Sequence, residues 1–186
     1  MTENKKDLRR RLKDRPGRGD DGALCGNILA HPWFREARRV MAYAAMAGEP
    51  DLEPVLEEVL RRGDRLALPR MEPDGSMTAR WVRDLGDLVP GVFGIREPGA
   101  SAPLADPAEL GLVLTPGMAF DRRGGRLGRG KGCYDRFLPA VKGRTLGICY
   151  HSCLLEKVPM EDHDRYLGGV VTDREIIYTG TEETAP

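Results

Sequence analysis

The sequence predicts a three-layer α/β/α fold built around a mainly parallel β-sheet. From residue 40 onward, short apolar runs alternate with amphipathic segments, which indicates strands and helices packed in layers. Residues 40–69 contain a complete strand, helix and strand unit, and a connection of this kind places the two strands parallel. Residues 110–115 form a continuous apolar run, which is typical of a strand buried on both faces.

Two helices are predicted before the first strand. Residues 5–13 are rich in Lys and Arg and carry Leu8 and Leu12 four positions apart, so they predict a short basic helix with one apolar face. Residues 21–31 place apolar side chains on one face and predict a second, weaker helix. Pro32 interrupts this pattern and is expected to end that helix.

The strand, helix and strand unit comes next. Residues 40–45 (VMAYAA) are short and apolar, and Gly48 ends the strand that they predict. Residues 51–62 repeat Leu and Val along one stripe, as a helix that covers a sheet does. Residues 65–69 are the second strand, which we expect to lie parallel to the first.

The rest of the chain is predicted to extend the sheet. A strand is expected at 77–82, while the turn-rich remainder of 72–108, with an apolar element at 92–95, has no firm assignment. The later elements are strands at 110–115, 145–150, 169–172 and 176–178, with a helix at 134–141. We expect a single domain over residues 1–178 and a polar tail over residues 179–186.

The composition excludes several classes of protein. The 186 residues include 29 Lys and Arg against 29 Asp and Glu, and this balance argues against a nucleic-acid partner, which would need a basic excess. No apolar stretch approaches the roughly 20 residues of a membrane-spanning helix, and the charged N-terminus lacks the apolar centre of a signal peptide. We therefore expect a cytoplasmic protein without a membrane partner, whose four cysteines remain thiols. A monomer or a weak homodimer is also expected, although composition does not determine the oligomeric state.

The most informative segment is the glycine-rich stretch between the buried strand at 110–115 and the helix at 134–141. It contains Gly124, Gly125, Gly128, Gly130 and Gly132, interleaved with Arg126, Arg129 and Lys131. Glycines allow backbone N–H groups to approach an anion closely, and the cations can neutralise phosphate oxygens. The N-terminus of the following helix also favours negative charge. The segment therefore predicts a phosphate-binding site.

Other interpretations of this stretch are less favourable. Residues 125–131 match the P-loop pattern G-x-x-x-x-G-K, but Gly132 replaces the Ser or Thr that would hold magnesium. Asp135 could hold the ion instead, from the first turn of the helix. The glycines could also form only a surface turn with solvated arginines. An RNA-binding arginine–glycine segment would be long and disordered, whereas this one is short and lies between a strand and a helix.

Cysteines and histidines offer two further candidate sites. Cys149, His151 and Cys153, with His163 further along the chain, raise the possibility of zinc. On a strand these side chains are about 6–7 Å apart, too far to converge easily on one small ion, so buried strand-end residues are the favoured interpretation. Cys133 is a candidate nucleophile because it lies beside the cationic loop.

Acidic candidates occur at three places in the chain. Glu49 comes just after the first strand, Glu97 precedes a proline, and residues 161–164 form an acidic cluster. In α/β sheets, ligand-binding groups gather on loops at the carboxyl ends of the strands, where both Glu49 and the glycine-rich loop are expected. Binding and simple solvation remain equally good accounts of Glu49 at this point.

A series of motifs runs in order along nearly the whole chain. It consists of K-x-x-x-R at 5–9, a strand followed by Glu at 43–49, GDRLALPR at 63–70, FGIREP at 93–98, TPGMAFD at 115–121, GRLGRGKGCYDRFL at 125–138 and VPMEDHD at 158–164. The block PG-x-x-FD…G-x-RLG-x-G-x-G-x-YD is specific. Together these motifs resemble those of the 5-formyltetrahydrofolate cyclo-ligases, also called methenyltetrahydrofolate synthetases.

The resemblance implies an ATP- and Mg²⁺-dependent enzyme of folate metabolism, with a fold related to the ribose-5-phosphate isomerase and CoA-transferase group. The formyl oxygen of 5-formyltetrahydrofolate would attack the γ-phosphate of ATP. N10 would then close the ring on the activated carbon, and phosphate would leave to give 5,10-methenyltetrahydrofolate. The implied small-molecule substrates are thus a reduced folate and ATP.

The resemblance also implies roles for individual residues. The nucleotide site would comprise Lys5, Arg9, Arg126, Leu127, Gly128, Arg129, Gly130, Lys131, Gly132, Cys133 and Tyr134, and of these Arg126, Arg129 and Lys131 would be the catalytic cations. The folate site would comprise Ala44, Met46, Glu49, Phe93 and Cys133. The Mg²⁺ ligands would be the hard oxygen donors Asp135 and Asp164.

Three positions depart from the family pattern. Cys133 replaces the first Tyr of GYYD, Cys153 replaces a common Gln, and Gly168 stands where an Asp often follows the HD motif. The first change removes an aromatic wall and a hydroxyl beside the formyl group. Two alternatives are therefore kept: a paralogue that uses the same ATP site on another formylated or carboxylated small molecule, and a folate- or nucleotide-binding protein without turnover.

Overall fold

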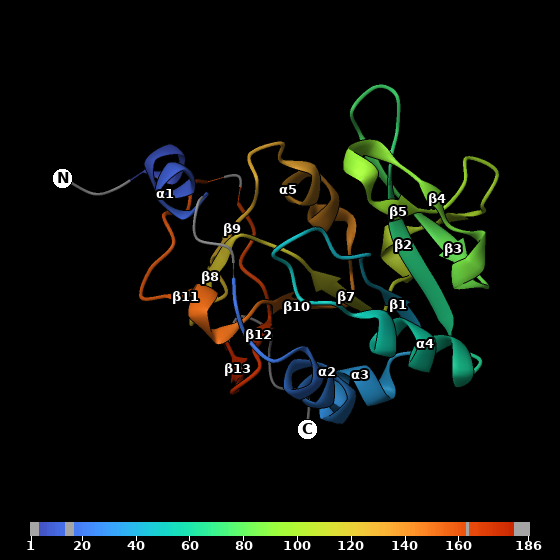
Figure 1. Cartoon of the computed structure of the whole chain (residues 1–186), viewed down its shortest axis with the longest axis horizontal. Coiled ribbons are helices and arrows are strands. Elements are labelled where there is room, and N and C mark those ends of the chain that lie inside the picture. Colours follow the sequence, from blue (N-terminus) through green and yellow to red (C-terminus); the bar gives the residue numbers. More distant parts are fainter. Residues whose placement is uncertain (1–3, 14–16, 163, 181–186) are drawn as a thin grey trace.

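The computed structural model describes residues 4–13, 17–162 and 164–180, with only the backbone of Phe93. Its centre is an eight-stranded sheet (Figure 1). In spatial order the strands are β13 (Ile176–Tyr178), β12 (Gly169–Val171), β10 (Arg144–Ile148), β7 (Leu112–Thr115), β1 (Arg39–Met41), β2 (Arg65–Met71), β3 (Met77–Val82) and β6 (Leu104–Ala105). The five strands from β12 to β2 are parallel, and antiparallel strands flank them at both edges.

Helices and two smaller sheets surround the central sheet. The helices are α1 (Lys5–Leu12), α2 (Asp21–Ala30), α3 (Pro32–Glu36), α4 (Glu53–Arg61) and α5 (Cys133–Phe137), with 3₁₀ turns η1 (Leu85–Asp87), η2 (Val92–Gly94), η3 (Pro107–Glu109), η4 (Leu138–Ala140) and η5 (His151–Cys153). The smaller sheets are β11 (Leu154–Leu155), β8 (Ala119–Asp121) and β9 (Arg126–Leu127), and the pair β4 (Val89–Pro90) and β5 (Arg96–Glu97).

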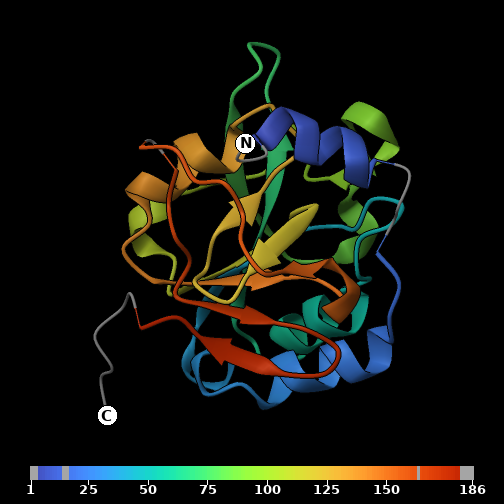
Figure 2. The ribbon, with the colours of Figure 1, turned by 90° about the vertical axis from the view of Figure 1, so that its left-hand side faces the viewer.

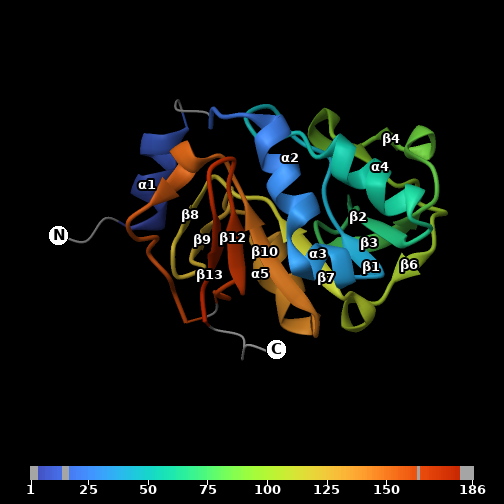
Figure 3. The same ribbon diagram turned by 90° about the horizontal axis from the view of Figure 1, so that it is seen from below.

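The layers are those that the sequence predicts. Helices α2, α3 and α4 cover one face of the sheet, as the view from below shows (Figure 3), and α5 lies on the opposite face (Figure 1). Alternate residues of the buried strands pack into two different hydrophobic clusters: Leu112 and Leu114 face α2 and α4, whereas Val113 faces α5. The expected parallel pairing of the first two strands is confirmed, with Val40 opposite Leu66.

Several element boundaries differ from the sequence prediction. Pro32 ends α2 but also begins α3, because the His31 imidazole Nδ1 accepts the Trp33 N–H and caps a new helix. The strand predicted at 40–45 ends at Met41. The helix predicted at 134–141 is a five-residue α-helix that continues as a 3₁₀ turn around Pro139, whose ring nitrogen has no proton to donate.

The glycine-rich stretch is not a plain loop. It contains the β8–β9 hairpin, and β11 pairs parallel with β8 to complete the small sheet. Figure 2 shows this sheet beneath α1, on the same side of the molecule as α5. All four cysteines are free thiols. Among the described residues, no helix is both long and apolar enough to span a bilayer.

Candidate active site

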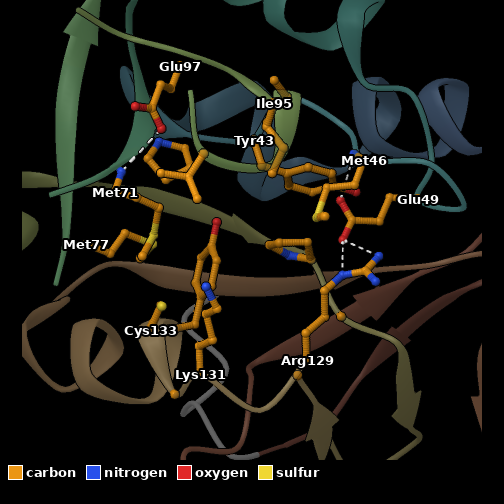
Figure 4. Close-up of a pocket in the computed structure, with 18 of the residues that line it drawn as sticks. Tyr43, Met46, Glu49, Met71, Met77, Ile95, Glu97, Arg129, Lys131 and Cys133 are labelled. Carbon is orange, nitrogen blue, oxygen red and sulfur yellow. Dashed lines mark hydrogen bonds and ion pairs between the residues drawn. The ribbon is translucent and has the colours of Figure 1, made fainter. Parts of the chain in front are cut away.

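A cavity of about 370 Å³ opens at the carboxyl ends of β1, β2 and β7, within the size range of small-molecule sites. One wall is mainly apolar and comes from β2, β3 and the segment 92–97. The other is charged and comes from the segment after β1 and from the glycine-rich stretch. Figure 4 shows Met71, Met77 and Ile95 across the cavity from Lys131 and Arg129. A ligand with an apolar ring and an anionic group would match this division.

Glu49 is the principal carboxylate of the charged wall. The chain turns after β1, and the Met46 N–H donates a hydrogen bond of 3.1 Å to Glu49 Oε2. Arg129 Nη2 donates to Glu49 Oε1 at 3.2 Å (Figure 4), and the Glu49 side chain is only 7% exposed. Burial raises the pKa of Glu49, while the Met46 N–H and the Arg129 charge oppose that rise. Glu49 is thus a carboxylate prepared to accept hydrogen bonds from a ligand.

Arg126 and Asp135 form a second ion pair in the cavity wall. Arg126 Nη2 donates to Asp135 Oδ1 at 2.7 Å, and the two side chains are 5% and 22% exposed. The guanidinium also faces the Tyr134 ring, with 5.5 Å between its central carbon and the ring centroid. The β9 strand and the short α5 helix therefore hold a cation and a carboxylate side by side.

Helix α1 brings two distant cations to the same region. Lys5 forms a buried ion pair with Asp164, and Arg9 Nε donates to the Gly128 carbonyl at 2.8 Å. Leu8, on the same helix, is buried against Leu127 and Val158. This apolar contact is the reason that α1 docks beside the glycine-rich stretch, with Arg9 directed at the Gly128 carbonyl and Lys5 at Asp164.

Asp121 stabilises the stretch from beneath and is fully buried. Its Oδ1 accepts the N–H groups of Arg123 and Gly125, each at 2.9 Å, and its Oδ2 accepts the Val158 N–H at 2.8 Å. The carboxylate therefore joins the glycine-rich stretch to the segment that carries Asp164. The TPGMAFD motif contains Asp121, but the sequence alone could not show whether Asp121 binds a ligand or stabilises the fold.

The structure places the sequence-predicted residues in two adjoining groups. The cavity is lined by Ala44, Met46, Glu49, Arg126, Gly128, Arg129, Lys131, Gly132, Cys133, Tyr134 and Asp135. Outside that lining, Lys5 contacts Asp164, Arg9 contacts Gly128 and lies against Gly130, and Leu127 is buried beneath the loop. The Phe93 side chain and His163 lie outside the described residues.

Sequence reasoning missed much of the apolar wall and one phenol. Met71 and Met77 line the cavity because the β2–β3 hairpin extends past the sheet edge, and Ile95 lines it because β5 folds back onto β4. Glu97, which the sequence offered as an acidic candidate, also lines the cavity. The FGIREP motif signalled the second segment without placing it. Tyr43 was taken as part of a strand, whereas it follows β1 and lines the cavity.

The fit of a metal ion rests on the carboxylates present. Within residues 4–13, 17–162 and 164–180, no three His, Cys, Asp or Glu side chains form a group that could hold a metal, and Cys149, His151 and Cys153 do not converge. Mg²⁺ commonly binds through one or two carboxylates plus substrate phosphates, so it does not need such a group. Asp135 fits this mode, since it offers a partly exposed carboxylate to the cavity.

Comparisons with known proteins identify relatives of this chain. The chain is 34% identical over 144 residues to 5-formyltetrahydrofolate cyclo-ligase of Mycolicibacterium smegmatis, a match that covers 74% of each chain. It is 32% identical over 155 residues to that of Escherichia coli (strain K12), covering 80% of this chain and 85% of the relative. An NMR structure of Aquifex aeolicus 5,10-methenyltetrahydrofolate synthetase matches with a TM-score of 0.84 at 29% identity, covering 98% and 96% of the two chains.

The chain also matches a sequence model of a whole protein family. Residues 2–173 match the model of the 5-formyltetrahydrofolate cyclo-ligase family, and this range includes the cavity, helix α1 and the segment that carries Asp164. The resemblance carried by the ordered motifs is therefore confirmed. From the shared motifs, the shared fold and the extent of these matches, the chain belongs to the 5-formyltetrahydrofolate cyclo-ligase family.

Proposed function

We propose that this enzyme converts 5-formyltetrahydrofolate and ATP into 5,10-methenyltetrahydrofolate, ADP and phosphate. The observation that carries the proposal is the cavity in which Glu49 lies opposite an apolar wall and beside the cationic glycine-rich stretch. A reduced folate and the terminal phosphate of ATP can meet there. The names of the similar proteins support the same reaction.

The phosphoryl-transfer half of the reaction is assigned to the glycine-rich stretch. The formyl oxygen attacks the γ-phosphorus, the bond to the β-phosphate oxygen breaks, and ADP leaves with its electron pair. Arg126, Arg129 and Lys131 offset the charge that develops on the phosphoryl oxygens. Lys5 and Arg9 contact the remaining phosphates from α1, because their side chains already lie beside this stretch.

Ring closure is assigned to the folate side of the cavity. The lone pair of N10 attacks the phosphorylated formyl carbon, the carbon–oxygen bond breaks, and phosphate leaves as N10 loses its proton. Glu49 accepts hydrogen bonds from the ring N–H and amino groups of the pterin and fixes its orientation. Met46 and the Met71 side of the cavity cover the ring, so water is excluded from the activated carbon.

Asp135 and Asp164 are proposed to bind Mg²⁺ together with the phosphates. When bound, the ion neutralises phosphate oxygens and orients them. Asp135 reaches the cavity directly, whereas Asp164 now neutralises Lys5. For Asp164 to act as a Mg²⁺ ligand, the Lys5 ammonium must leave Asp164 and pair with a phosphate of ATP instead.

The same exchange applies to the other ion pairs of the site. Arg129 contacts Glu49, and Arg126 contacts Asp135. Both arginines are proposed to bind phosphate, and their carboxylate partners are proposed to bind the pterin (Glu49) and Mg²⁺ (Asp135). Phosphate binding would draw Arg129 from Glu49 and leave that carboxylate for the pterin. ATP and folate are therefore expected to favour each other's binding.

The test is to mix the protein with MgATP and 5-formyltetrahydrofolate and to follow methenyl product absorbance and ADP release in parallel. Equal amounts of both products support the proposal. ADP release with another formylated or carboxylated compound only would favour a paralogue, and ligand-induced thermal stabilisation without ADP would favour a binding protein.

A Glu49→Gln variant tests the folate assignment. The KM for folate should rise by about tenfold or more, because a charge-assisted hydrogen bond contributes about 1.5–3 kcal/mol, while the KM for ATP should change much less. Glu57→Gln, the same type of change at an exposed position of α4 outside the cavity lining, is the matched control. Equal effects of both changes would contradict the assignment.

A further inference from the structure

Tyr43 lines the cavity and carries a buried hydroxyl that no described residue satisfies. The side chain is 2% exposed, it lines the cavity, and its hydroxyl has no hydrogen-bond partner among residues 4–13, 17–162 and 164–180. By contrast, the Tyr150 hydroxyl donates to Asp21 Oδ1 at 2.6 Å. A buried hydroxyl without a partner is costly, so its retention at a binding cavity points to a partner on the ligand.

The surroundings of Tyr43 determine what that hydroxyl can do. Figure 4 shows its ring between Ile95 and Met46, on the same side of the cavity as Glu49. Glu49 and the Tyr134 phenol both lie close enough to act electrostatically on it, and burial raises the pKa of Tyr43 well above its usual value. The phenol is therefore protonated at neutral pH and can donate a hydrogen bond.

We propose that the Tyr43 hydroxyl donates a hydrogen bond to an acceptor atom of the pterin ring, next to the N–H groups that Glu49 accepts, and that Tyr43 is a specificity-determining residue. This inference rests on the proposed function. A pterin edge presents an amino group and a ring N–H side by side, with a carbonyl oxygen on one flank and an unprotonated ring nitrogen on the other. A carboxylate next to a phenol matches two donors next to an acceptor.

The test is the Tyr43→Phe variant, with Tyr178→Phe as the matched control. Tyr178 lies on β13, is 53% exposed and is outside the cavity lining. For Tyr43→Phe, we expect an unchanged or higher thermal midpoint without ligand, because no protein hydrogen bond is lost. We expect a KM for folate raised about 2- to 12-fold, with the KM for ATP little changed, since a neutral hydrogen bond contributes about 0.5–1.5 kcal/mol. Tyr178→Phe should leave both KM values unchanged.

Calorimetric binding of 5-formyltetrahydrofolate without ATP provides a second readout that does not depend on turnover. Its Kd should rise in Tyr43→Phe by the same factor as the KM. If wild type and Tyr43→Phe bind the folate equally, the inference is wrong while the proposed function stands. If the variant melts lower and loses ATP and folate affinity together, Tyr43 is structural and the inference is also wrong. If wild type neither binds nor converts the folate, the proposed function itself fails, and the inference with it.

Discussion

Replacing Asp121 by Asn, a side chain of nearly the same shape, should destabilise the glycine-rich stretch that forms part of the cavity wall. The carboxylate accepts three backbone N–H groups in a fully buried position. The Asn oxygen can keep the bonds to Arg123 and Gly125, but each weakens by about 1 kcal/mol because the acceptor is no longer charged. The Asn NH₂ group then faces the Val158 N–H, and two opposed donors add a further loss of about 1–3 kcal/mol.

The total expected loss is about 3–5 kcal/mol of unfolding free energy. For a chain of this size, that corresponds to a thermal midpoint lower by about 6–20 °C. Thermal denaturation followed by circular dichroism measures the change. Because Asp121 joins the glycine-rich stretch to the Asp164 segment, the Kd for MgATP, measured well below the midpoint, should rise as well.

Asp84→Asn is the control for this variant. Asp84 is exposed and accepts one N–H, from Gly86, at the cap of a 3₁₀ turn, where Asn caps equally well. Its thermal midpoint should change by no more than about 2 °C. If Asp121→Asn and Asp84→Asn have the same midpoint as wild type, the reasoning on the buried carboxylate is refuted.

Three further outcomes are expected. Burial, with the charge of Arg144, lowers the pKa of His31 to about 4 in the folded protein, so the contribution of His31 to stability is complete above pH about 6.5 and is lost as pH falls toward 4. Urea denaturation at pH 7 and pH 5 should therefore show a smaller loss of unfolding free energy in His31→Asn than in wild type. Equal losses in the two proteins would contradict this. Gly124→Ala should cost several kcal/mol and Gly75→Ala only about 1 kcal/mol, because both have φ near +80° but only the Cβ at Gly124 would come within 2.3 Å of Leu167 O; equal midpoints would exclude the close approach as the cause. Cys133→Tyr should raise kcat with 5-formyltetrahydrofolate by about 2- to 10-fold through a restored aromatic wall, and an unchanged rate would mean that Cys133 is fully tolerated.

The sequence alone was sufficient for the central layers. Residues 40–69 predicted a parallel pair joined by a helix, and residues 110–115 predicted a fully buried strand; both are present as β1, α4, β2 and β7. These predictions hold because hydrophobic periodicity and a continuous apolar run are local properties of the sequence. Motif order also identified the family, since it depends on residue types and not on contacts.

The short strands could not be predicted from local sequence. The β8–β9 hairpin and β11 are only two or three residues long, and they form a sheet because distant segments meet. The pair β4 and β5 is equally short. Such strands have too little pattern to stand out from turns, which is why residues 72–108 had no firm assignment outside the strand predicted at 77–82.

For the site, the sequence determined which groups are available, and the tertiary structure decided how they are paired. The cationic loop and Glu49 were evident because glycines, arginines and a strand-end carboxylate are visible in one dimension. That Arg129 neutralises Glu49, across 80 residues, and that Asp164 neutralises Lys5, across 159, follows only from the packing of α1 and the sheet. The burial of Asp121 and Tyr43 was likewise decided there, because burial depends on neighbours that are remote in the chain.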